Sequence, residues 1–560
     1  MHRKTAGGKK HSLPFSQKTE KCPGSLPGHS YEPISKMKKT ICFAALLLSS
    51  AVRAMAGDYN ILDFGAVADG RTLATAAIQQ AVDRCSAQGG GRVVIPSGNY
   101  YTGVIFMRSG VELHLEQNAR LIGSTDYKDY PDMEKERKGL IHCAGVSNIA
   151  VTGFGEIYGS GECPAFQVGG QNELRPHCIL LDDCRKVNVQ DVTLRNAGFW
   201  TFKIHDSREV FVRGIRIYSH SNFNNDGIDI DGRDIVVSDC LIEATDDGIC
   251  FKSESPSGEP CQNIAVTNCV VASNCNAIKF GTAAKCGFRN ITVSNCVIKT
   301  PAENDLFSYK SHIVPGVSVP VHNNSGIALE QVDAAVFEKV TISNIVMDNV
   351  LTPIFIRFGA RRPREPRFFR DVVISNIVAN GVSHMSSSIT GIPGHRVEGI
   401  TISNVTLNVC GGGLIDAVEK EVPEQIRMYP ENKMFGPSLP AYGFYLRHVD
   451  GIVLENIRVN LEHSDRRHAL WLEDAHNVRI SGLEAKDHTS EQALVRIKEC
   501  TNVTFTGYDG RGRIPLLMRV SGAGTGRIKL AGNDLTRVER HVERSAEVAP
   551  EAIIEKYNFE

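Results

Sequence analysis

The sequence predicts an all-β protein folded as a parallel β-helix, a solenoid of stacked coils, with a helix capping its N-terminal end. Three observations predict this fold. Short runs of alternating apolar residues recur along the chain, an Asn, Asp or Gly closes most of these runs, and an amphipathic segment precedes them. Alternating Val and Ile at a period of roughly 20–35 residues is typical of stacked parallel strands, because each coil buries these side chains against the next.

The first 56 residues are expected to lie outside the fold. Residues 37–56 combine a basic start at Met37, an apolar run from Ile41 to Leu48 and a small-residue end at Ala56, which are the three parts of a secretory signal peptide. We therefore expect residues 1–36 to be an upstream extension or a misassigned start. The mature protein is expected in the periplasm or outside the cell, and the apolar run is too short to span a bilayer.

Residues 57–140 are expected to form an N-terminal cap and the first coils. The segment from Thr75 to Cys85 carries apolar residues at helical spacing and ends before Gly89-Gly90-Gly91, which predicts an amphipathic helix over the open end of the solenoid. The following segment, residues 92–100, reads as the first strand.

Residues 141–535 are expected to form the β-helix itself, followed by a C-terminal tail over residues 536–560. Runs such as Asn263-Ile-Ala-Val-Thr-Asn268 and Lys339-Val-Thr-Ile-Ser-Asn344 continue to the far end of this region. The Asn that closes a run is expected to turn the chain and to stack on its counterparts in neighbouring coils. Function is then expected in the longer loops and on one exposed strand face.

Charge and cysteine content bear on nucleic-acid binding and on the state of the thiols. The chain has 62 Lys and Arg against 63 Asp and Glu, and this balance gives no indication of a nucleic-acid partner. No protein partner is implied either. Of sixteen Cys, fourteen lie beyond Cys42, an even number that permits disulfides in an exported protein. Several follow the residue that ends a strand-like run, as Cys240, Cys269 and Cys296 do, and this favours a buried ladder of thiols over disulfides or metal ligands.

Three carboxylates recur at the period of one coil. Asp226 lies in Asn-Asn-Asp-Gly-Ile-Asp, and Asp246 and Asp247 follow about twenty residues later in Asp-Asp-Gly. Residues one coil apart can be nearest neighbours, since stacked strands lie about 4.8 Å apart. Inverting hydrolysis of a glycosidic bond needs one protonated carboxyl and one or two ionised carboxylates, and mutual repulsion raises one pKa in such a cluster. The alternative is that both motifs are ordinary turn sequences.

A family resemblance adds to this reading. Asp63-Phe-Gly-Ala-Val-Ala-Asp-Gly70, the helix and Gly91-Arg-Val-Val-Ile-Pro96 resemble the opening of pectin-degrading β-helix enzymes and of some viral tailspikes. Together with the Asp motifs they resemble the polygalacturonase-like glycoside hydrolases of family 28, over roughly residues 58–510. The resemblance implies a right-handed β-helix without a metal or organic cofactor. It also implies that Asp246 is the general acid and that Asp226 and Asp247 activate water.

The chain departs from the family pattern at three places. Asn225 stands where the family has Thr, and Asn276 stands where it has His, so the protonation of the acid must be tuned by other groups. Ala328 and Glu330 occupy the positions of an Arg and a Lys that hold a galacturonate carboxylate in the family. These two changes disfavour galacturonate in the subsite where the bond is cleaved, unless Lys252, Lys279 or Lys310 restores a positive charge. The expected substrate-binding residues are Asn225, Lys252, Asn276, Lys279, Glu330 and Trp200.

The sequence as a whole predicts an exported inverting glycoside hydrolase that acts on pectic polysaccharide, of the galacturonan or rhamnogalacturonan type, or on its oligosaccharides. The long insertion from Cys410 to Pro440 is expected to wall off one end of a groove and to favour exo action, on a glycone that need not be galacturonate. Two alternatives remain at this point. One is a β-helix polysaccharide lyase, and the other is a carbohydrate-binding solenoid without activity, which the substitution at Asn276 would suit.

Overall fold

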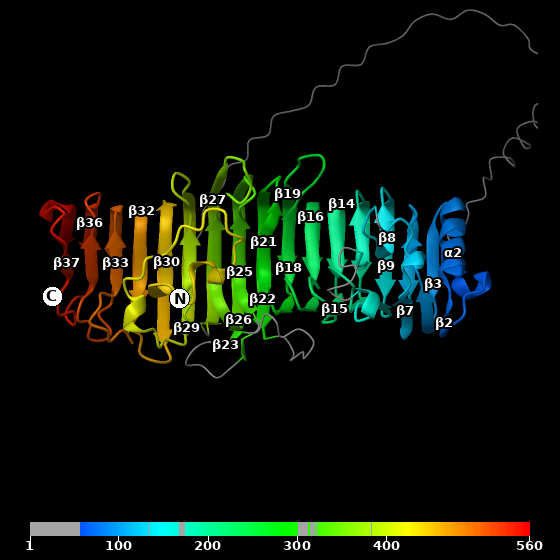
Figure 1. The fold of residues 1–560 in the computed structure, drawn as a ribbon, viewed down its shortest axis with the longest axis horizontal. Helices are drawn as coiled ribbons and strands as arrows, with labels where there is room; N and C mark the ends of the chain where they lie inside the picture. Colours follow the sequence, from blue (N-terminus) through cyan, green and yellow to red (C-terminus); the bar gives the residue numbers. More distant parts are fainter. Residues whose placement is uncertain are drawn as a thin grey trace, which may run out of the picture. The chain divides into compact units, whose positions relative to one another are not determined.

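The computed structural model describes residues 57–560 except residues 134, 167–173, 301–311, 314–319, 322, 382 and 486. The expected upstream extension and signal peptide therefore lie outside the described residues, as does Lys310. Residues 56–560 form one compact unit, in which 36 strands join a single winding sheet. The expected all-β parallel solenoid is confirmed (Figure 1).

Parallel pairing arranges the strands in three stacks that run along the solenoid, and long strands bend from one stack into the next. The first stack carries the candidate site and contains β5 (Ile105–Phe106), β8 (Gly139–Ala144), β11 (His177–Asp182), β14 (Phe202–Arg213), β16 (Ile228–Ser238), β18 (Ile249–Ser253), β21 (Asn276–Ala284), β25 (Asn323–Gln331), β26 (Val336–Phe358), β28 (Ser387–Thr390), β30 (Ala441–Asp450), β32 (His468–Glu484), β33 (Val495–Lys498), β35 (Met518–Ser521) and β37 (Val542–Arg544).

The second stack shares β14, β16, β26 and β32 with the first. It further contains β1 (Asp58–Asn60), β3 (Gly91–Ile95), β6 (Val111–Leu115), β9 (Ser147–Gly153), β12 (Arg185–Gln190), β19 (Cys261–Thr267), β22 (Phe288–Lys299), β27 (Phe368–Gly381), β29 (Val397–Val409), β31 (Val453–Leu461), β34 (Thr501–Thr506), β36 (Gly526–Ala531) and β38 (Ile553–Lys556). The third stack begins with β2 (Asp69–Leu73), β4 (Gly98–Thr102), β7 (Ala119–Gly123), β10 (Glu156–Tyr158), β13 (Thr193–Arg195), β15 (Arg216–Ser219), β17 (Leu241–Ala244) and β20 (Val270–Ser273), and continues through the later halves of the long strands.

Helical structure is sparse in the described part. The α-helix α2 (Thr75–Ala87) buries Ile78, Val82 and Cys85 and contacts β1 and β3, and it lies at the end of the described solenoid where β2 and β3 begin (Figure 1). Short 3-10 turns are η1 (Ile61–Phe64), η2 (Tyr127–Asp129), η3 (Pro164–Phe166), η5 (Ile415–Ala417), η6 (Asn432–Phe435) and η7 (Pro550–Ala552). A pair of antiparallel strands, β23 (His312–Ile313) and β24 (Pro320–Val321), stands apart from the main sheet. No helix in the described ranges is long and apolar enough to cross a membrane.

The interior of the coils is apolar, as the alternation predicts. Inward-facing side chains of successive coils stack directly, for example Phe251 on Phe280 with ring centroids 4.2 Å apart. The Asn residues that close the runs lie in the left-handed region, Asn344 with φ 58°, and their amides bond from coil to coil. Nδ2 of Asn344 donates to Asn295 at 2.9 Å, and Nδ2 of Asn376 donates to Asn344 at 2.9 Å. This ladder confirms the expected turning and stacking role.

The fourteen cysteines of the described residues are free thiols, and Cys240, Cys269 and Cys296 lie in hydrogen-bonding contact in successive coils. This arrangement is the expected ladder. The chain end differs from the expectation. Residues expected in a C-terminal tail form β37 and β38, which pair with β35 and β36 and add a last coil to the stacks.

Candidate active site

Three consecutive coils of the first stack bring the predicted catalytic residues together. Asp226 precedes β16, Asp246 and Asp247 precede β18, and Asn276 begins β21. The strand starts lie in register, and the amides of Gly227 and Gly248 donate to the carbonyls of Asp247 and Asn276, each at 2.8 Å. A Cβ on Gly248 would lie 2.7 Å from the carbonyl oxygen of Ala277. Glycine is therefore required for the close approach that stacks the acidic residues.

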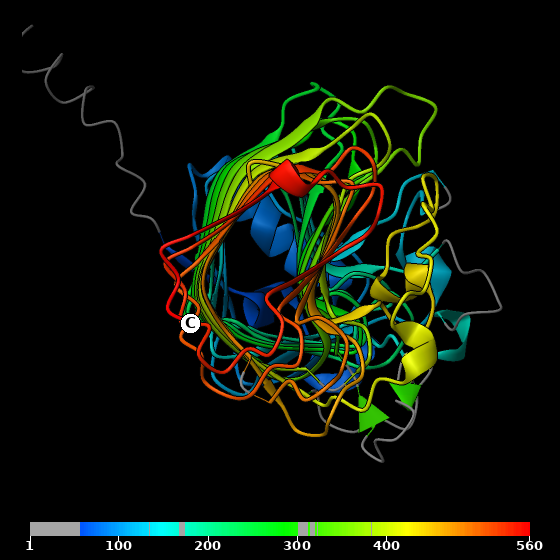
Figure 2. The same ribbon diagram turned by 90° about the vertical axis from the view of Figure 1, so that its left-hand side faces the viewer.

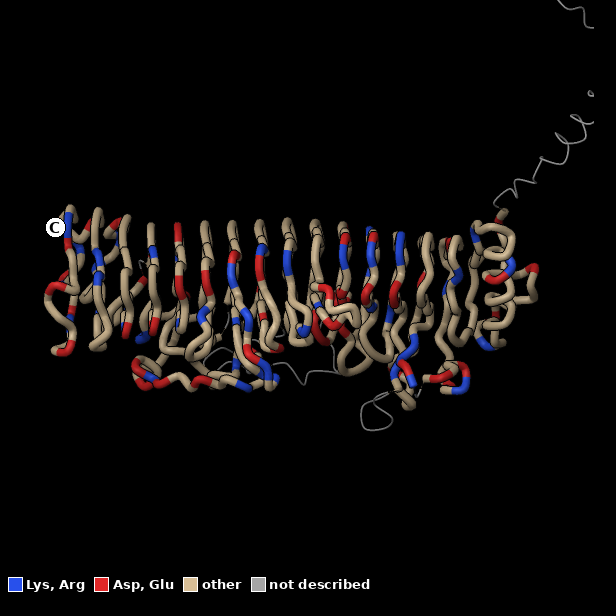
Figure 3. Tube along the Cα trace, turned by 90° about the horizontal axis from the view of Figure 1, so that it is seen from above, with Lys and Arg blue, Asp and Glu red and all other residues tan. Residues whose placement is uncertain are grey.

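The three aspartates form one cluster. A carboxylate oxygen of Asp226, one of Asp247 and Sγ of Cys250 all lie within 4.8 Å of one another, and so do atoms of Asp246, Asp247 and Cys275. All three aspartates are buried, and Asp246 is the most exposed at 6%. Figure 3 shows acidic positions gathered near the middle of the solenoid. The structure thus places Asp226, Asp246 and Asp247 where they can act on one bond.

Two buried lysines lie among the carboxylates. Nζ of Lys252 lies 3.7 Å from Oδ2 of Asp226 and 3.4 Å from Oδ1 of Asp229. Nζ of Lys279 lies 3.1 Å from Oδ2 of Asp247 and 3.6 Å from Oε2 of Glu330. Lys252 is 9% exposed and Lys279 is 2% exposed. Each ammonium compensates a pair of buried carboxylates, which would otherwise be too costly to bury.

Asn276 holds one carboxylate of the cluster, that of Asp247. Its Nδ2 donates to Oδ1 of Asp247 at 3.0 Å, and its backbone N–H donates to the same oxygen at 3.3 Å. An amide in this position fixes the orientation of Asp247 and favours its ionised form, although it cannot exchange a proton.

Asn225 differs from the expected substrate-binding role. Its Oδ1 accepts hydrogen bonds from the backbone of Ser221 and Asn222, and its Nδ2 donates to the carbonyls of Ala197 and Phe199. The side chain is 0% exposed. We therefore assign Asn225 the task of bracing the loop that carries Asp226, because its amide is fully engaged within the protein.

Asp229 is a site residue that the sequence reasoning passed over. It lies on β16 in register with Lys203 and Cys250, and neither of its oxygens makes a hydrogen bond within the described part of the chain. The signal was present, since Asp229 is the last residue of the Asn-Asn-Asp-Gly-Ile-Asp motif. Its two-residue spacing from the turn places it on the outer face of the strand beside Asp226.

Burial and mutual repulsion leave protons on the cluster. Burial, followed by the charges of Asp229 and Asp246, raises the pKa of Asp226 well above its ordinary value. Burial raises the pKa of Asp229 to about 7 against the opposing effect of Lys252, and burial raises the pKa of Glu330 to about 8 against that of Lys279. Burial lowers the pKa of Lys279, but Asp247 and Glu330 outweigh it, so this pKa is raised well above its ordinary value. The lysines stay charged and the carboxyls share protons.

Trp200 lines the N-terminal side of the cluster. Nζ of Lys252 lies 4.8 Å from the centre of its ring and Nζ of Lys203 lies 5.2 Å from it. The ring stacks on Phe199 at 5.0 Å and is half-buried. Its position beside the acidic cluster suits an aromatic face for a sugar ring.

A long loop covers the first stack on the C-terminal side of the cluster. We call residues 410–440 the covering loop. Its apolar side chains, such as Val422 and Phe435, pack on the outer faces of Phe355, Tyr445 and Trp471. Figure 2 shows this yellow segment lying outside the coils. One loop residue reaches the cluster, since Nζ of Lys279 lies 5.6 Å from the ring centre of Tyr429.

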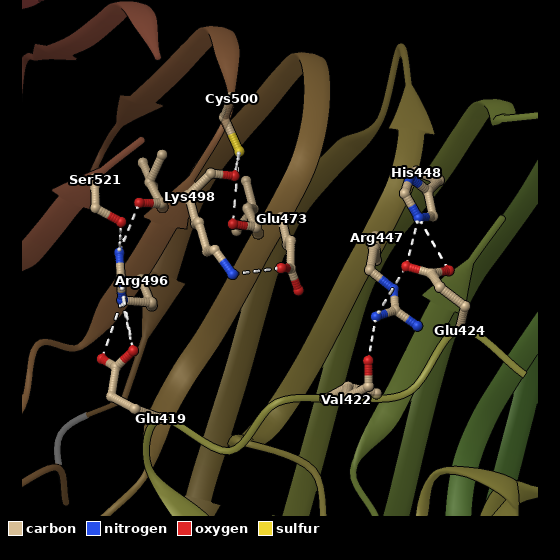
Figure 4. A network of polar contacts seen from close by, with 12 residues as sticks. Glu419, Val422, Glu424, Arg447, His448, Glu473, Arg496, Lys498, Cys500 and Ser521 are labelled. Carbon is tan, nitrogen blue, oxygen red and sulfur yellow. Dashed lines mark hydrogen bonds and ion pairs between the residues drawn. The ribbon is translucent and has the colours of Figure 1, made fainter. Parts of the chain in front are cut away.

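Buried arginines fix the covering loop to successive strands. Arg447 donates to the carbonyls of Val422 and Pro423 at 2.6 and 2.9 Å, and Arg496 pairs with Glu419 at 3.1 Å (Figure 4). Arg357 likewise donates to the carbonyls of Glu424 and Gln425. Each arginine projects from a different strand of the first stack. The loop is therefore held at several points and forms a fixed wall.

The donors around Asp247 suit a proton-transfer site better than a metal site. Carboxylate and thiol groups converge there, but the ammonium groups of Lys252 and Lys279 lie within 3.1–3.7 Å of the same carboxylates. A divalent cation would be repelled at this distance. The geometry favours acid–base chemistry at the cluster.

Comparison with known proteins agrees with this geometry. Residues 85–307 match the family model described as Glycosyl hydrolases family 28. The chain is 25% identical over 410 residues to a "Probable polygalacturonase" of Vitis vinifera, covering 67% of this chain and 78% of the relative. It is also 25% identical over 381 residues to a "Probable rhamnogalacturonase A" of Aspergillus niger, covering 67% and 69% of the two chains.

A solved structure shares the fold. The exopolygalacturonase of Thermotoga maritima superposes with a TM-score of 0.55 at 22% identity, covering 72% of this chain and 92% of that one. The described solenoid is accordingly a right-handed parallel β-helix, as expected. The family match over residues 85–307 and the polygalacturonase relatives together support a polygalacturonase-like glycoside hydrolase of family 28.

Proposed function

We propose that this glycoside hydrolase is exported and cleaves glycosidic bonds in pectic polysaccharide, of the galacturonan or rhamnogalacturonan type, or in its oligosaccharides, with inversion at the anomeric carbon. The observation that carries the proposal is the convergence of Asp226, Asp246 and Asp247 from two adjacent coils. Relatives named as polygalacturonase and as rhamnogalacturonase support the pectic substrate. The signal-like segment of residues 37–56 supports export.

In the proposed mechanism Asp246 is the general acid. Its carboxyl gives a proton to the leaving oxygen as the glycosidic bond breaks, and water attacks the anomeric carbon while passing a proton to Asp226 or Asp247. Asp246 is the most exposed of the three and is therefore the most accessible to the leaving oxygen, and Nδ2 of Asn224, which donates to its Oδ2 at 3.2 Å, orients the carboxyl.

A proton must leave Asp226 before Asp226 can accept one from water. The pKa of Asp226 is raised in the free enzyme by burial and by its acidic neighbours, so Asp226 carries a proton for part of the time. Water activation at Asp226 requires that this proton move to Asp246, which is possible because the carboxyls are coupled. Asp247 pairs with Lys279 and accepts a hydrogen bond from Asn276, and these contacts hold it in place to act as the base.

Exo action is proposed from the covering loop. The loop packs across β25, β26, β30 and β32, which directly follow the catalytic coils, and Tyr429 approaches the cluster itself. A polymer chain laid along the first stack would meet this wall within a few coils, since each coil adds about 4.8 Å. Release of short products from one end of the polymer follows, and the glycone need not be galacturonate.

The experiment that tests the proposal is digestion of a panel of pectic substrates with the protein starting at Gly57. Homogalacturonan, both rhamnogalacturonan types and neutral side chains are incubated and the products are separated by chromatography, with absorbance followed at 235 nm. Release of saturated short sugars, lost in Asp246→Asn, is the expected result. New absorbance at 235 nm would identify a lyase instead, and no product from any substrate would favour a binding solenoid.

A further inference from the structure

Glu330 is a buried acid with one charged partner within ion-pair distance in the described part of the chain. It lies on β25, one coil beyond Lys279, is 0% exposed, and both of its oxygens lack hydrogen bonds within the described residues. Its ion pair is with Lys279 at 3.6 Å. Stability alone does not explain this buried carboxyl, because a protein with neutral side chains of similar volume in place of a buried ion pair is usually no less stable.

Lys279 is shared between this acid and the catalytic cluster. Its Nζ lies closer to Asp247, at 3.1 Å, and the ring of Tyr429 lies on another side at 5.6 Å. The residue is 2% exposed. Lys279 therefore makes two ion pairs at once, one with Asp247 and one with Glu330.

A sugar carboxylate that approached Lys252 or Lys279 would find each ammonium already paired with two acids of the protein. Asp247 and Glu330 are two acids around one ammonium, and Asp226 and Asp229 are two acids around Lys252. A sugar carboxylate at either lysine would have to compete with two acids that already share its ammonium, and each of these acids repels it when ionised. A neutral sugar brings no such conflict and can use its hydroxyls as donors to the carboxylates.

We propose that Glu330 is a positioning residue that determines specificity: it holds Lys279 against Asp247 and so selects a sugar without a carboxylate at the catalytic aspartates. The inference rests on the proposed function and names the class of glycone. It applies to the sugar bound at Asp247. An acidic sugar of the polymer can be accommodated at Lys203, two coils from the strand that follows Asp247. Lys203 has no ion pair within 4.0 Å among the described residues, and its Nζ lies 5.2 Å from the ring centre of Trp200.

The test compares two sugars that differ only at C6. Hydrolysis of 4-nitrophenyl α-D-galactopyranoside and of the matching α-D-galacturonide is measured for the wild type and for Glu330→Gln. We expect the wild type to favour the neutral glycoside. We expect the ratio of kcat/KM for the galacturonide to that for the galactoside to rise about tenfold or more in Glu330→Gln, chiefly through KM, because Lys279 is freed for the sugar carboxylate.

Three further variants separate specificity from stability. Glu330→Asp should restore most of the wild-type ratio. The double variant Glu330→Gln with Lys279→Met should lose the gain, because no cation remains. Glu338→Gln is the matched control, since Glu338 is also a buried acid with basic partners, Arg289 and Arg370, but lies in the second stack. Its ratio should stay within about twofold of the wild type.

The affinity for the free sugars tests the proposal even if the enzyme hydrolyses the nitrophenyl glycosides slowly. Calorimetric titration with galacturonic acid and galactose is carried out on the wild type and on Glu330→Gln. Stronger galacturonate binding in the variant supports the proposal. A wild type that prefers the uronate, or a folded variant whose ratio and binding are unchanged, overturns it. Failure of the proposed function would show differently, as absence of hydrolysis on the whole pectic panel with either sugar still bound.

Discussion

Replacing Lys279 by Met is the sharpest single test of how the cluster is held together. The substitution removes the ammonium that lies 3.1 Å from Asp247 and 3.6 Å from Glu330 while keeping most of the side-chain volume. At an effective dielectric constant of about 20, each contact corresponds to roughly 5 kcal/mol of Coulomb attraction. Removing one partner of a buried ion pair typically costs about 3–5 kcal/mol.

The loss should depend on pH, because the two acids can take up protons in place of the lysine. We expect the free energy of unfolding of Lys279→Met to fall by about 3–5 kcal/mol near pH 8 and by clearly less near pH 5, where Glu330, whose pKa is about 8, holds a proton. We also expect kcat to fall by about 100-fold or more, since a protonated Asp247 cannot accept a proton from water.

The assay is urea unfolding followed by circular dichroism at pH 5 and pH 8, together with hydrolysis of the best pectic substrate. Lys285→Met is the matched control, because Lys285 pairs with Glu254 at 2.9 Å but its side chain is 52% exposed. An exposed pair contributes about 0–1 kcal/mol. A loss below about 1 kcal/mol at pH 8 in Lys279→Met, with activity kept, would refute the reasoning.

Four further predictions follow from the same contacts. Asp246→Asn should lower kcat by about 1,000-fold or more with KM changed only a few-fold, and near-normal turnover would remove Asp246 from the mechanism. Arg447→Met should loosen the covering loop, seen as faster proteolytic cleavage near residue 422 and as longer products from polymer; unchanged products would separate the loop from exo action. The free energy of unfolding of the wild type should fall by roughly 5–7 kcal/mol from pH 5 to pH 8.5, because Asp229 and Glu330 have folded pKa values of about 7 and about 8, above their ordinary values of 3.8 and 4.5, so the folded state holds protons that the unfolded state has lost. A flat profile in urea titrations would contradict these shifts. Lys203→Met should raise KM for acidic oligosaccharides several-fold and leave neutral ones unchanged, and an equal effect on both in steady-state kinetics would exclude a charge-specific role.

Local sequence was enough to predict the solenoid and the position of the aspartates. Each coil repeats an alternation of Val and Ile that can be buried only by stacking, and each closing Asn, such as Asn344, has a side chain suited to the left-handed turn it makes. Asp226 and Asp247 lie at the starts of adjacent strands, so the repeat period alone brings them together. For the same reason the sequence could place Asn276 beside Asp247.

The interpretation of the lysines and of Asn225 required the tertiary structure. Lys252 and Lys279 have the alternating pattern of solvent-facing residues, and only the approach of Glu330 from the next coil and of Tyr429 from the covering loop makes the Lys279 environment buried. Asn225 is polar and adjacent to Asp226, but its amide turns inward to backbone groups of an earlier coil.

The sequence by itself thus determined the fold and the proximity of Asp226, Asp246 and Asp247, because these depend on periodicity and on residues a fixed number of positions apart. The tertiary structure alone decided which charges compensate each other, which amide is structural, and that the covering loop is pinned by Arg357, Arg447 and Arg496. Those features depend on contacts between coils and loops separated by about 20 to 110 residues along the chain, and the strength of a charge contact is set by burial, which only the packed structure provides.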